Sequence, residues 1–167
     1  VTLEKSTMAD QMLEILKALS YLSDTNIIFT LPNADTGGRV LIELINDFVA
    51  EHKNSCVHNS LGQLRYLSCV KHVDAVVGNS SSGLIEVPSL FKGTINIADR
   101  QLGRLKAESV IDCMPEHKSI LKALNKLYSE EFNKSLKSTV NPYGNGGASE
   151  KVIKKIKTHS LTGILKK

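Results

Sequence analysis

The sequence contains no tryptophan, and its aromatic content is only 5%. Its net charge is a mild +4. A surface that binds nucleic acid usually interleaves aromatic residues with a basic face, which this composition does not offer. Much of the positive charge is instead carried by C-terminal lysines: Lys151, Lys154, Lys155, Lys157, Lys166 and Lys167. Such a cluster is typical of a solvated helix face and a frayed tail, so we expect no nucleic-acid partner.

Long apolar runs and metal-ligand spacings are also lacking. No apolar stretch approaches the roughly 18 residues that a membrane helix needs, and the first residues show no signal-peptide pattern. The three cysteines, Cys56, Cys69 and Cys113, are odd in number and are not spaced as metal ligands. We expect them to be small buried residues in a reduced compartment. The expected protein is cytoplasmic, with no membrane partner, no metal and no cofactor.

The apolar residues that are present alternate between two periodicities. Spacings of three and four predict helices over 8–22, 40–48, 61–70, 84–90, 120–128 and 148–156. Short apolar runs predict strands over 26–31, 55–58, 74–78, 94–97 and 109–112, the first of them buried. Strands alternating with helices favour right-handed βαβ units on a parallel sheet. We therefore expect an α/β, Rossmann-like three-layer sandwich of about five strands, with helices on both faces.

The sharpest candidate for a site is the segment Gly78-Asn79-Ser80-Ser81-Ser82-Gly83, called here the serine turn. It follows a predicted strand and begins a predicted helix, where free backbone N–H groups favour an anion. Hydroxyls of Ser80 and Ser81 add donors, and Glu86, one turn further, is suited to accept hydrogen bonds from a ribose diol. The plainer alternative is a serine N-cap with Glu86 as a capping carboxylate.

A hydrolase elbow, G-x-S-x-G, is a second alternative for the same segment. The window 79–83 nearly matches it, but Asn79 stands where the motif needs glycine. Asp112 and His117 follow in the order of a catalytic triad, yet they are only about five positions apart. No oxyanion motif precedes them. We therefore favour anion binding over nucleophilic catalysis.

Three other predicted strand ends are polar, and strand ends are where an open parallel sheet binds ligands. Asn33 follows the first predicted strand, either as a site residue or as a helix cap. His58 ends the second, where it could meet a phosphate or a base. Arg100 and Arg104 follow the fourth; two arginines there could fork a phosphate, and Arg100, nearer the strand, is the stronger candidate.

The sequence resembles the hydrolysing UDP-N-acetylglucosamine 2-epimerases over essentially its whole length. The resemblance is carried by the segments 78–89, 95–104 and 108–112, and by the shorter segments 1–5, 31–35 and 141–144. The family has a GT-B fold, in which two Rossmann-like halves face a cleft. The resemblance implies that residues 1–167 are a single UDP-binding domain, the C-terminal half of such an enzyme, with 136–147 as a loop before the final helix. The abrupt start of the chain also favours a domain cut from a longer protein.

The resemblance also implies roles for individual residues. Ser80 and Ser81 would hold the diphosphate and Glu86 the uridine ribose. Arg100 would point at the diphosphate or the sugar, and Asn33 would face the sugar, which makes these two the catalytic candidates of this half. His58 matches a cleft histidine in the UDP site less closely.

The implied reaction is elimination of UDP from UDP-N-acetylglucosamine, followed by addition of water, to give N-acetylmannosamine for sialic acid synthesis. Carboxylates of the missing N-terminal domain would carry out the proton transfers, so this half alone would barely turn over. The expected partners are a UDP-sugar and that N-terminal domain, in a homo-oligomer of the full-length protein. A UDP-diacetamido sugar as substrate, a GT-B glycosyltransferase, and a nucleotide-sensing domain without chemistry are the alternatives.

Overall fold

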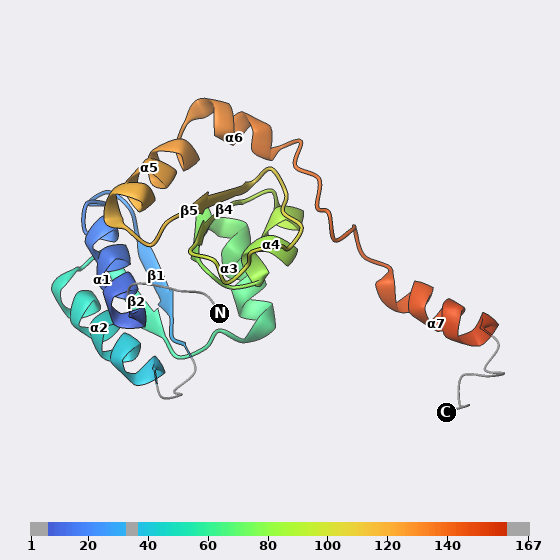
Figure 1. Ribbon diagram of the computed structural model, residues 1–167, viewed down its shortest axis with the longest axis horizontal. Helices are drawn as coiled ribbons and strands as arrows, with labels where there is room; N and C mark the ends of the chain where they lie inside the picture. The colour runs from blue at the N-terminus through green and yellow to red at the C-terminus, as the bar shows by residue number, and fades with distance from the viewer. Residues whose placement is uncertain (1–6, 33–36, 160–167) are drawn as a thin grey trace.

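The computed structural model describes residues 7–32 and 37–159 (Figure 1). In chain order the helices and strands are α1 (Met8–Leu19), β1 (Ile27–Thr30), α2 (Gly38–Glu51), β2 (Ser55–His58), α3 (Gly62–His72), β3 (Ala75–Gly78), α4 (Ser82–Ile85), the 3₁₀ helix η1 (Val87–Leu90), β4 (Gly93–Ile97), β5 (Val110–Cys113), α5 (His117–Leu127), α6 (Glu130–Leu136) and α7 (Ala148–Thr158). Helices and strands alternate as far as β4, as the sequence predicts, but β5 follows β4 with no helix between them. Asn33 lies outside the described residues.

The strands are all parallel, but they form two sheets rather than the single sheet expected. β1 pairs with β2, and β3, β4 and β5 form a separate sheet in that order. Within the described residues no ladder joins β1 to β3. Because the strands of each sheet are parallel, the segments that follow β3, β4 and β5 emerge at one edge of the larger sheet.

The main core surrounds β4, the central strand of the larger sheet, all of whose residues are buried. Ile95 and Ile97 pack in one cluster with the buried residues of α5. The alternate residue Thr94 points to the other face, where its hydroxyl donates to the carbonyl oxygen of Gly83 in α4 at 2.8 Å. α4 and α5 therefore cover opposite faces of this sheet, as a three-layer sandwich requires.

The smaller sheet is covered less completely, and here two predictions are wrong. Ile27 and Phe29 pack against α1 and α2, but Ile28 between them is 43% exposed. Cys56 on β2 is exposed as well, whereas we expected both the strand and the cysteine to be buried. Cys69 and Cys113 are half-buried, and all three thiols are free. β1 is apolar on both faces, but among the described residues the face of Ile27 and Phe29 packs into a core while Ile28 on the other face does not.

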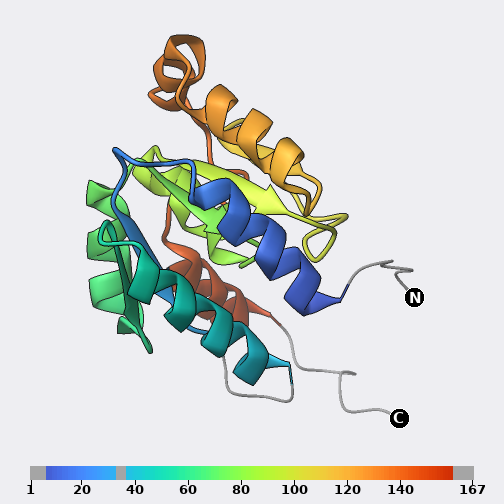
Figure 2. The same cartoon turned by 90° about the vertical axis from the view of Figure 1, so that its left-hand side faces the viewer.

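Helix α1 connects the two cores, because it contacts both α2 and α5 (Figure 2). It begins with a capping box, in which the Thr7 hydroxyl and the Asp10 carboxylate each bond the other's backbone N–H. Ala18 belongs to the core around β4, while Leu16 and Leu19 belong to the core of the smaller sheet. The helix thus buries two faces, one in the core of each sheet.

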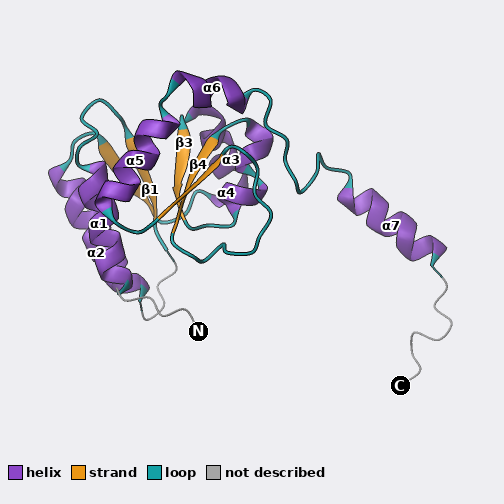
Figure 3. Ribbon diagram, turned by 45° about the horizontal axis from the view of Figure 1, so that its top comes forward, coloured by secondary structure: helices purple, strands orange, loops and turns teal. Residues whose placement is uncertain are grey.

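The final helix, α7, stands apart from the rest of the described chain (Figures 1 and 3). It has no buried residue, and its apolar residues Val152, Ile153 and Ile156 are all more than half exposed. The predicted loop before it has no helix or strand from 137 to 147, although Leu136 belongs to α6, a helix that the sequence analysis did not predict. The solvated lysine face was predicted, but the exposed apolar face was not.

Candidate functional site

The serine turn follows β3, at the edge of the larger sheet where β4 also ends. Residues 98–109 connect β4 to β5 and are called here the β4–β5 loop. Two consecutive residues of this loop contact Asn79 of the serine turn: Gln101 Nε2 donates to its carbonyl oxygen at 2.7 Å, and Arg100 Nη1 donates to its Oδ1 at 3.4 Å. The structure therefore brings Arg100 to the serine turn, as expected for two strand ends at one edge of a sheet.

Some backbone N–H groups of the serine turn have no acceptor among the described residues. The carbonyl oxygens of Ser80 and Ser81 accept from the N–H groups of Gly83 and Leu84. In the described part of the chain, however, no protein acceptor meets the backbone N–H of Ser80 or Ser81. Ser81 is the N-cap of α4 and its side chain makes no capping bond, but Ser80 Oγ accepts from the backbone N–H of Ser82, the first residue of the helix, at 3.4 Å. A serine hydroxyl thus meets one N–H group at the start of α4, as the N-cap interpretation expects, while the N–H groups of Ser80 and Ser81 remain available to an outside acceptor.

The helix that follows is shorter than predicted, which changes how an anion would be held. A single helix was expected from residue 84 to residue 90, but α4 has only four residues and a separate 3₁₀ helix follows it, with Pro88 near its start. Proline favours the first turn of a helix and interrupts an interior. Because the dipole of such a short helix is small, the donors themselves must supply most of the attraction for an anion.

Glu86 lies between these two short helices and is half-buried. It is the C-cap of α4 and the N-cap of η1, and its side chain makes no capping bond to η1. In the described part of the chain its carboxylate takes part in no hydrogen bond or ion pair. It is therefore not a first-turn capping group but an unoccupied acceptor, one turn from the free N–H groups.

Tyr66 is a residue of this region that the sequence analysis missed. It lies on α3, and its hydroxyl accepts a hydrogen bond from Ser82 Oγ at 2.8 Å. Burial raises the pKa of the Tyr66 phenol, and the nearby carboxylate of Glu86 raises it further. The phenol therefore stays neutral, with its proton. No signal in the sequence singles out Tyr66, because a tyrosine in a helical pattern is ordinarily a core residue. Only its contact with Ser82 in the structure identifies it as part of this region.

The remaining candidates are not joined to the serine turn. His58 ends β2 in the smaller sheet, and within the described residues its side chain makes no hydrogen bond or ion pair. Asp112 binds Lys106 through both carboxylate oxygens and also accepts from Asn96. His117 pairs with Glu14 instead. Asp112 and His117 therefore have partners of their own, which removes the support for a hydrolase triad.

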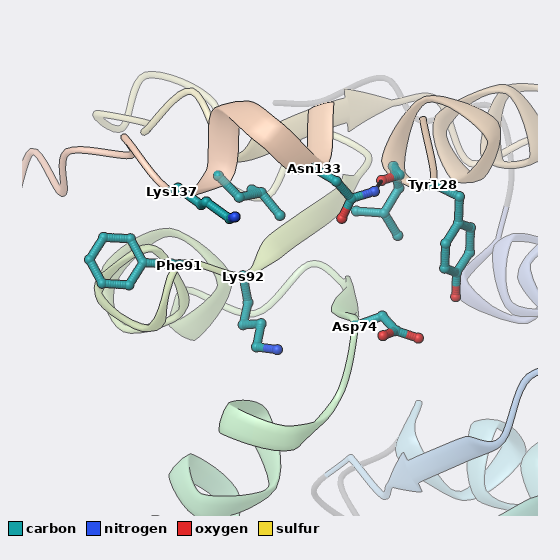
Figure 4. A pocket seen from close by; sticks show the side chains of 8 residues that line it. Asp74, Phe91, Lys92, Tyr128, Asn133 and Lys137 are labelled. Carbon is teal, nitrogen blue, oxygen red and sulfur yellow. Dashed lines mark hydrogen bonds between the residues drawn. The ribbon is translucent and has the colours of Figure 1, made fainter. Parts of the chain in front are cut away.

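A cavity of about 220 Å³ lies at the opposite edge of the larger sheet (Figure 4). Asp74 precedes β3 and Lys92 precedes β4, so the cavity is at the amino ends of these strands. Phe91, Tyr128 and Lys137 also line it. None of the predicted site residues borders this cavity, so it is separate from the serine turn.

Metal sites and membrane-spanning helices are two other features that a site of this kind could involve. In residues 7–32 and 37–159, no group of three His, Cys, Asp or Glu side chains is arranged to hold a metal ion. No helix in the same part of the chain has the length and apolar content to span a membrane. The chemistry of the polar groups at the end of the larger sheet suits a phosphate-containing ligand.

Comparison with known proteins gives a consistent result. A polysialic acid biosynthesis protein, P7, of Escherichia coli is 41% identical over 143 residues, which cover 85% of this chain and 36% of that protein. The GDP/UDP-N,N′-diacetylbacillosamine 2-epimerase (hydrolyzing) of Campylobacter jejuni is 37% identical to this chain. The match covers 100% of this chain and 44% of that protein. Among solved structures, the UDP-GlcNAc 2-epimerase of Methanocaldococcus jannaschii, in complex with UDP-GlcNAc and UDP, matches with a TM-score of 0.70. That match has 18% identity and covers 90% of this chain and 41% of that one.

These matches fix the fold class as the Rossmann-like half of a GT-B fold. The chain spans less than half the length of the relatives it matches. The family model for UDP-N-acetylglucosamine 2-epimerase matches residues 1–157, nearly the whole chain. The chain therefore belongs to the UDP-N-acetylglucosamine 2-epimerase family.

Proposed function

We propose that this chain holds the UDP part of a UDP-sugar, as the C-terminal half of a hydrolysing UDP-N-acetylglucosamine 2-epimerase. The observation that carries the proposal is the pair of unpaired backbone N–H groups at Ser80 and Ser81, with Arg100 beside the same turn. Backbone N–H groups and a guanidinium are the donors that diphosphates bind. The free carboxylate of Glu86 then accepts from the ribose hydroxyls.

In this proposal the chain stabilises the leaving group. Elimination breaks the bond between the sugar C1 and the diphosphate oxygen, so negative charge develops on UDP. The N–H groups of Ser80 and Ser81 and the guanidinium of Arg100 face that charge and lower the barrier. Water then adds to the unsaturated sugar and gives N-acetylmannosamine. The proposal also assigns Asn33 to the sugar, and His58 to UDP.

The proton transfers belong to groups outside this chain. Removing the proton from C2 needs a positioned base, and the addition of water needs an acid that returns a proton to C2 while the hydroxyl adds to C1. The sequence offers no carboxylate pair at a spacing that we would expect for acid–base work on one sugar ring. We therefore place these groups on an N-terminal half across a cleft, in a homo-oligomeric, cytoplasmic protein, and the relatives are long enough to contain such a half.

A UDP-diacetamido sugar is a second candidate substrate. The Campylobacter relative, whose name specifies N,N′-diacetylbacillosamine, is 37% identical over the whole of this chain. The UDP-N-acetylglucosamine 2-epimerase of Neisseria meningitidis is 31% identical over 77% of it. The two substrates differ on the sugar ring and share UDP. Assaying the protein together with its N-terminal half on both UDP-sugars, and identifying the released sugar, distinguishes the two candidates.

Calorimetric titration tests the diphosphate assignment directly. UDP should bind more tightly than UMP, because the serine turn and Arg100 hold the distal phosphate. Equal affinity for the two nucleotides would contradict the assignment. Glu86→Gln should weaken UDP binding about tenfold, because a charged acceptor on a diol is replaced by a neutral one. The mutant should bind UDP and 2′-deoxy-UDP about equally; if Glu86 acts only in the fold, its substitution will lower thermal stability and leave affinity unchanged.

A further inference from the structure

Gln101 is a buried residue in an exposed stretch of the β4–β5 loop. Its side chain is only 2% exposed, whereas the residues on either side, Arg100 and Leu102, are exposed. An amide is costly to bury unless it is hydrogen-bonded. Its Nε2 donates to the carbonyl oxygen of Asn79 at 2.7 Å, and this bond ties the loop to the serine turn.

Arg100 contacts the same asparagine through a different group. Its Nη1 donates to Asn79 Oδ1 at 3.4 Å, and its side chain is exposed. Asn79 thus accepts from two neighbours, through its backbone from Gln101 and through its side chain from Arg100. A guanidinium has about five N–H donors, so this one bond leaves most of them free for an anion.

We propose that Gln101 and Asn79 are positioning residues that hold the Arg100 guanidinium beside the free N–H groups of Ser80 and Ser81. The two sets of donors then act on one diphosphate. Gln101 fixes the backbone of the loop against the turn, and Asn79 restrains the direction of the guanidinium. An arginine that is already ordered loses less side-chain entropy when it binds phosphate. This inference rests on the proposed binding of UDP.

Titrations with UDP and with uridine test the proposal, because uridine lacks the phosphates that Arg100 would contact. Gln101→Met keeps the length of the side chain and adds no buried polar group, but it removes the donor to Asn79. We expect it to weaken UDP binding roughly tenfold and to leave uridine binding unchanged. In the double variant with Arg100→Ala, UDP should bind no more weakly than to Arg100→Ala alone, because both changes remove the same contact.

Asn79→Ala keeps the proposal testable if Gln101→Met fails to fold. Asn79 is exposed, and this change retains the backbone carbonyl that Gln101 needs while it removes the side-chain oxygen bound by Arg100. We expect weaker UDP binding, again not additive with Arg100→Ala. Additive losses in either double variant, or an equal loss of uridine affinity, would overturn the positioning role.

Asn54 offers a matched control in the other half of the molecule. Its Nδ2 donates to the backbone carbonyls of Leu22 and Thr25 at 2.9 Å and 2.7 Å, so it is also an amide that ties two segments together. Asn54→Ala should lower thermal stability and leave UDP affinity unchanged. If the unaltered protein fails to prefer UDP over UMP, the proposed function itself fails. If the unaltered protein prefers UDP but the losses of affinity in the double variants with Arg100→Ala are additive, only the positioning role fails.

Discussion

The two sheets differ in how completely they are enclosed. Every residue of β4 is buried, with helices on both faces and a strand at each edge. β1 and β2 alternate between half-buried and exposed residues, and in residues 7–32 and 37–159 each has one strand neighbour. The serine turn and Arg100 both lie at the end of the enclosed sheet. A binding site gains precision from a rigid support, and here the enclosed sheet supplies it.

The largest expected effect comes from removing the same side chain in each sheet. Ile95→Ala on β4 should lower the free energy of unfolding by about 2–5 kcal/mol, because it leaves a cavity in a fully enclosed core. Ile28→Ala on β1 should lower it by less than about 1 kcal/mol, since that side chain is already 43% exposed. Urea denaturation of the two variants measures both. Equal losses would mean that the exposed face of β1 is covered in solution.

Thiol reactivity sharpens the comparison without a mutation. Burial, and to a smaller extent the carboxylate of Asp112, raise the pKa of Cys113 on β5 from 9.0 to about 11. Near neutral pH this leaves roughly a hundredfold less thiolate than at an unshifted cysteine. Cys56 on β2 is exposed. Alkylation with iodoacetamide, followed by peptide mapping, should therefore label Cys56 well before Cys113; the reverse order would contradict the enclosure of the larger sheet.

The contact between helices α1 and α5, which links the cores of the two sheets, should depend on pH. Glu14 on α1 accepts from the backbone N–H and from Nδ1 of His117, both at 2.7 Å. The backbone bond, and then the side-chain bond, lower the pKa of Glu14 below its usual 4.5. Because the folded pKa is the lower one, this stabilisation is present above pH 4.5 and is lost as the pH falls through the folded value.

Glu14→Gln should therefore flatten the loss of stability in acid, as followed by thermal melts from pH 6 downward. Asp10→Asn is the matched control, since the pKa of Asp10 is also lowered, by hydrogen bonds from Thr7 within the same helix cap. The control should retain the part of the acid dependence that comes from Glu14. Identical pH profiles for Glu14→Gln and the unaltered protein would show that the contact between Glu14 and His117 does not stabilise the packing of α1 against α5.

The smallest effect is expected in α7, which belongs to neither core. Val152→Ser together with Ile156→Ser should change the free energy of unfolding by no more than about 0.5 kcal/mol per substitution, because both side chains are exposed. Chemical denaturation measures this change. A loss of several kcal/mol would mean that the apolar face of α7 packs against a partner or another part of the protein.

The succession of helices and strands was predictable because it depends on local periodicity. All five strands and most helices lie where the spacing of apolar residues places them. The failures have tertiary causes. Ile28 and Cys56 belong to apolar strands, but whether a strand face is buried depends on which helices cover it. Likewise, α6 is too short for its pattern to stand out from a loop.

The candidate site divides along the same line. The sequence by itself determined that serines, an arginine and a glutamate follow consecutive strands of a parallel sheet, because the carboxyl ends of parallel strands emerge at one edge. Only the tertiary structure decided which hydrogen-bonding groups are left free. The N–H groups of Ser80 and Ser81 are unpaired because they precede the first turn of α4 and no described residue accepts from them, and Arg100 and Gln101 both contact Asn79 of the turn. Such pairing depends on contacts between segments far apart in sequence, which no local pattern records.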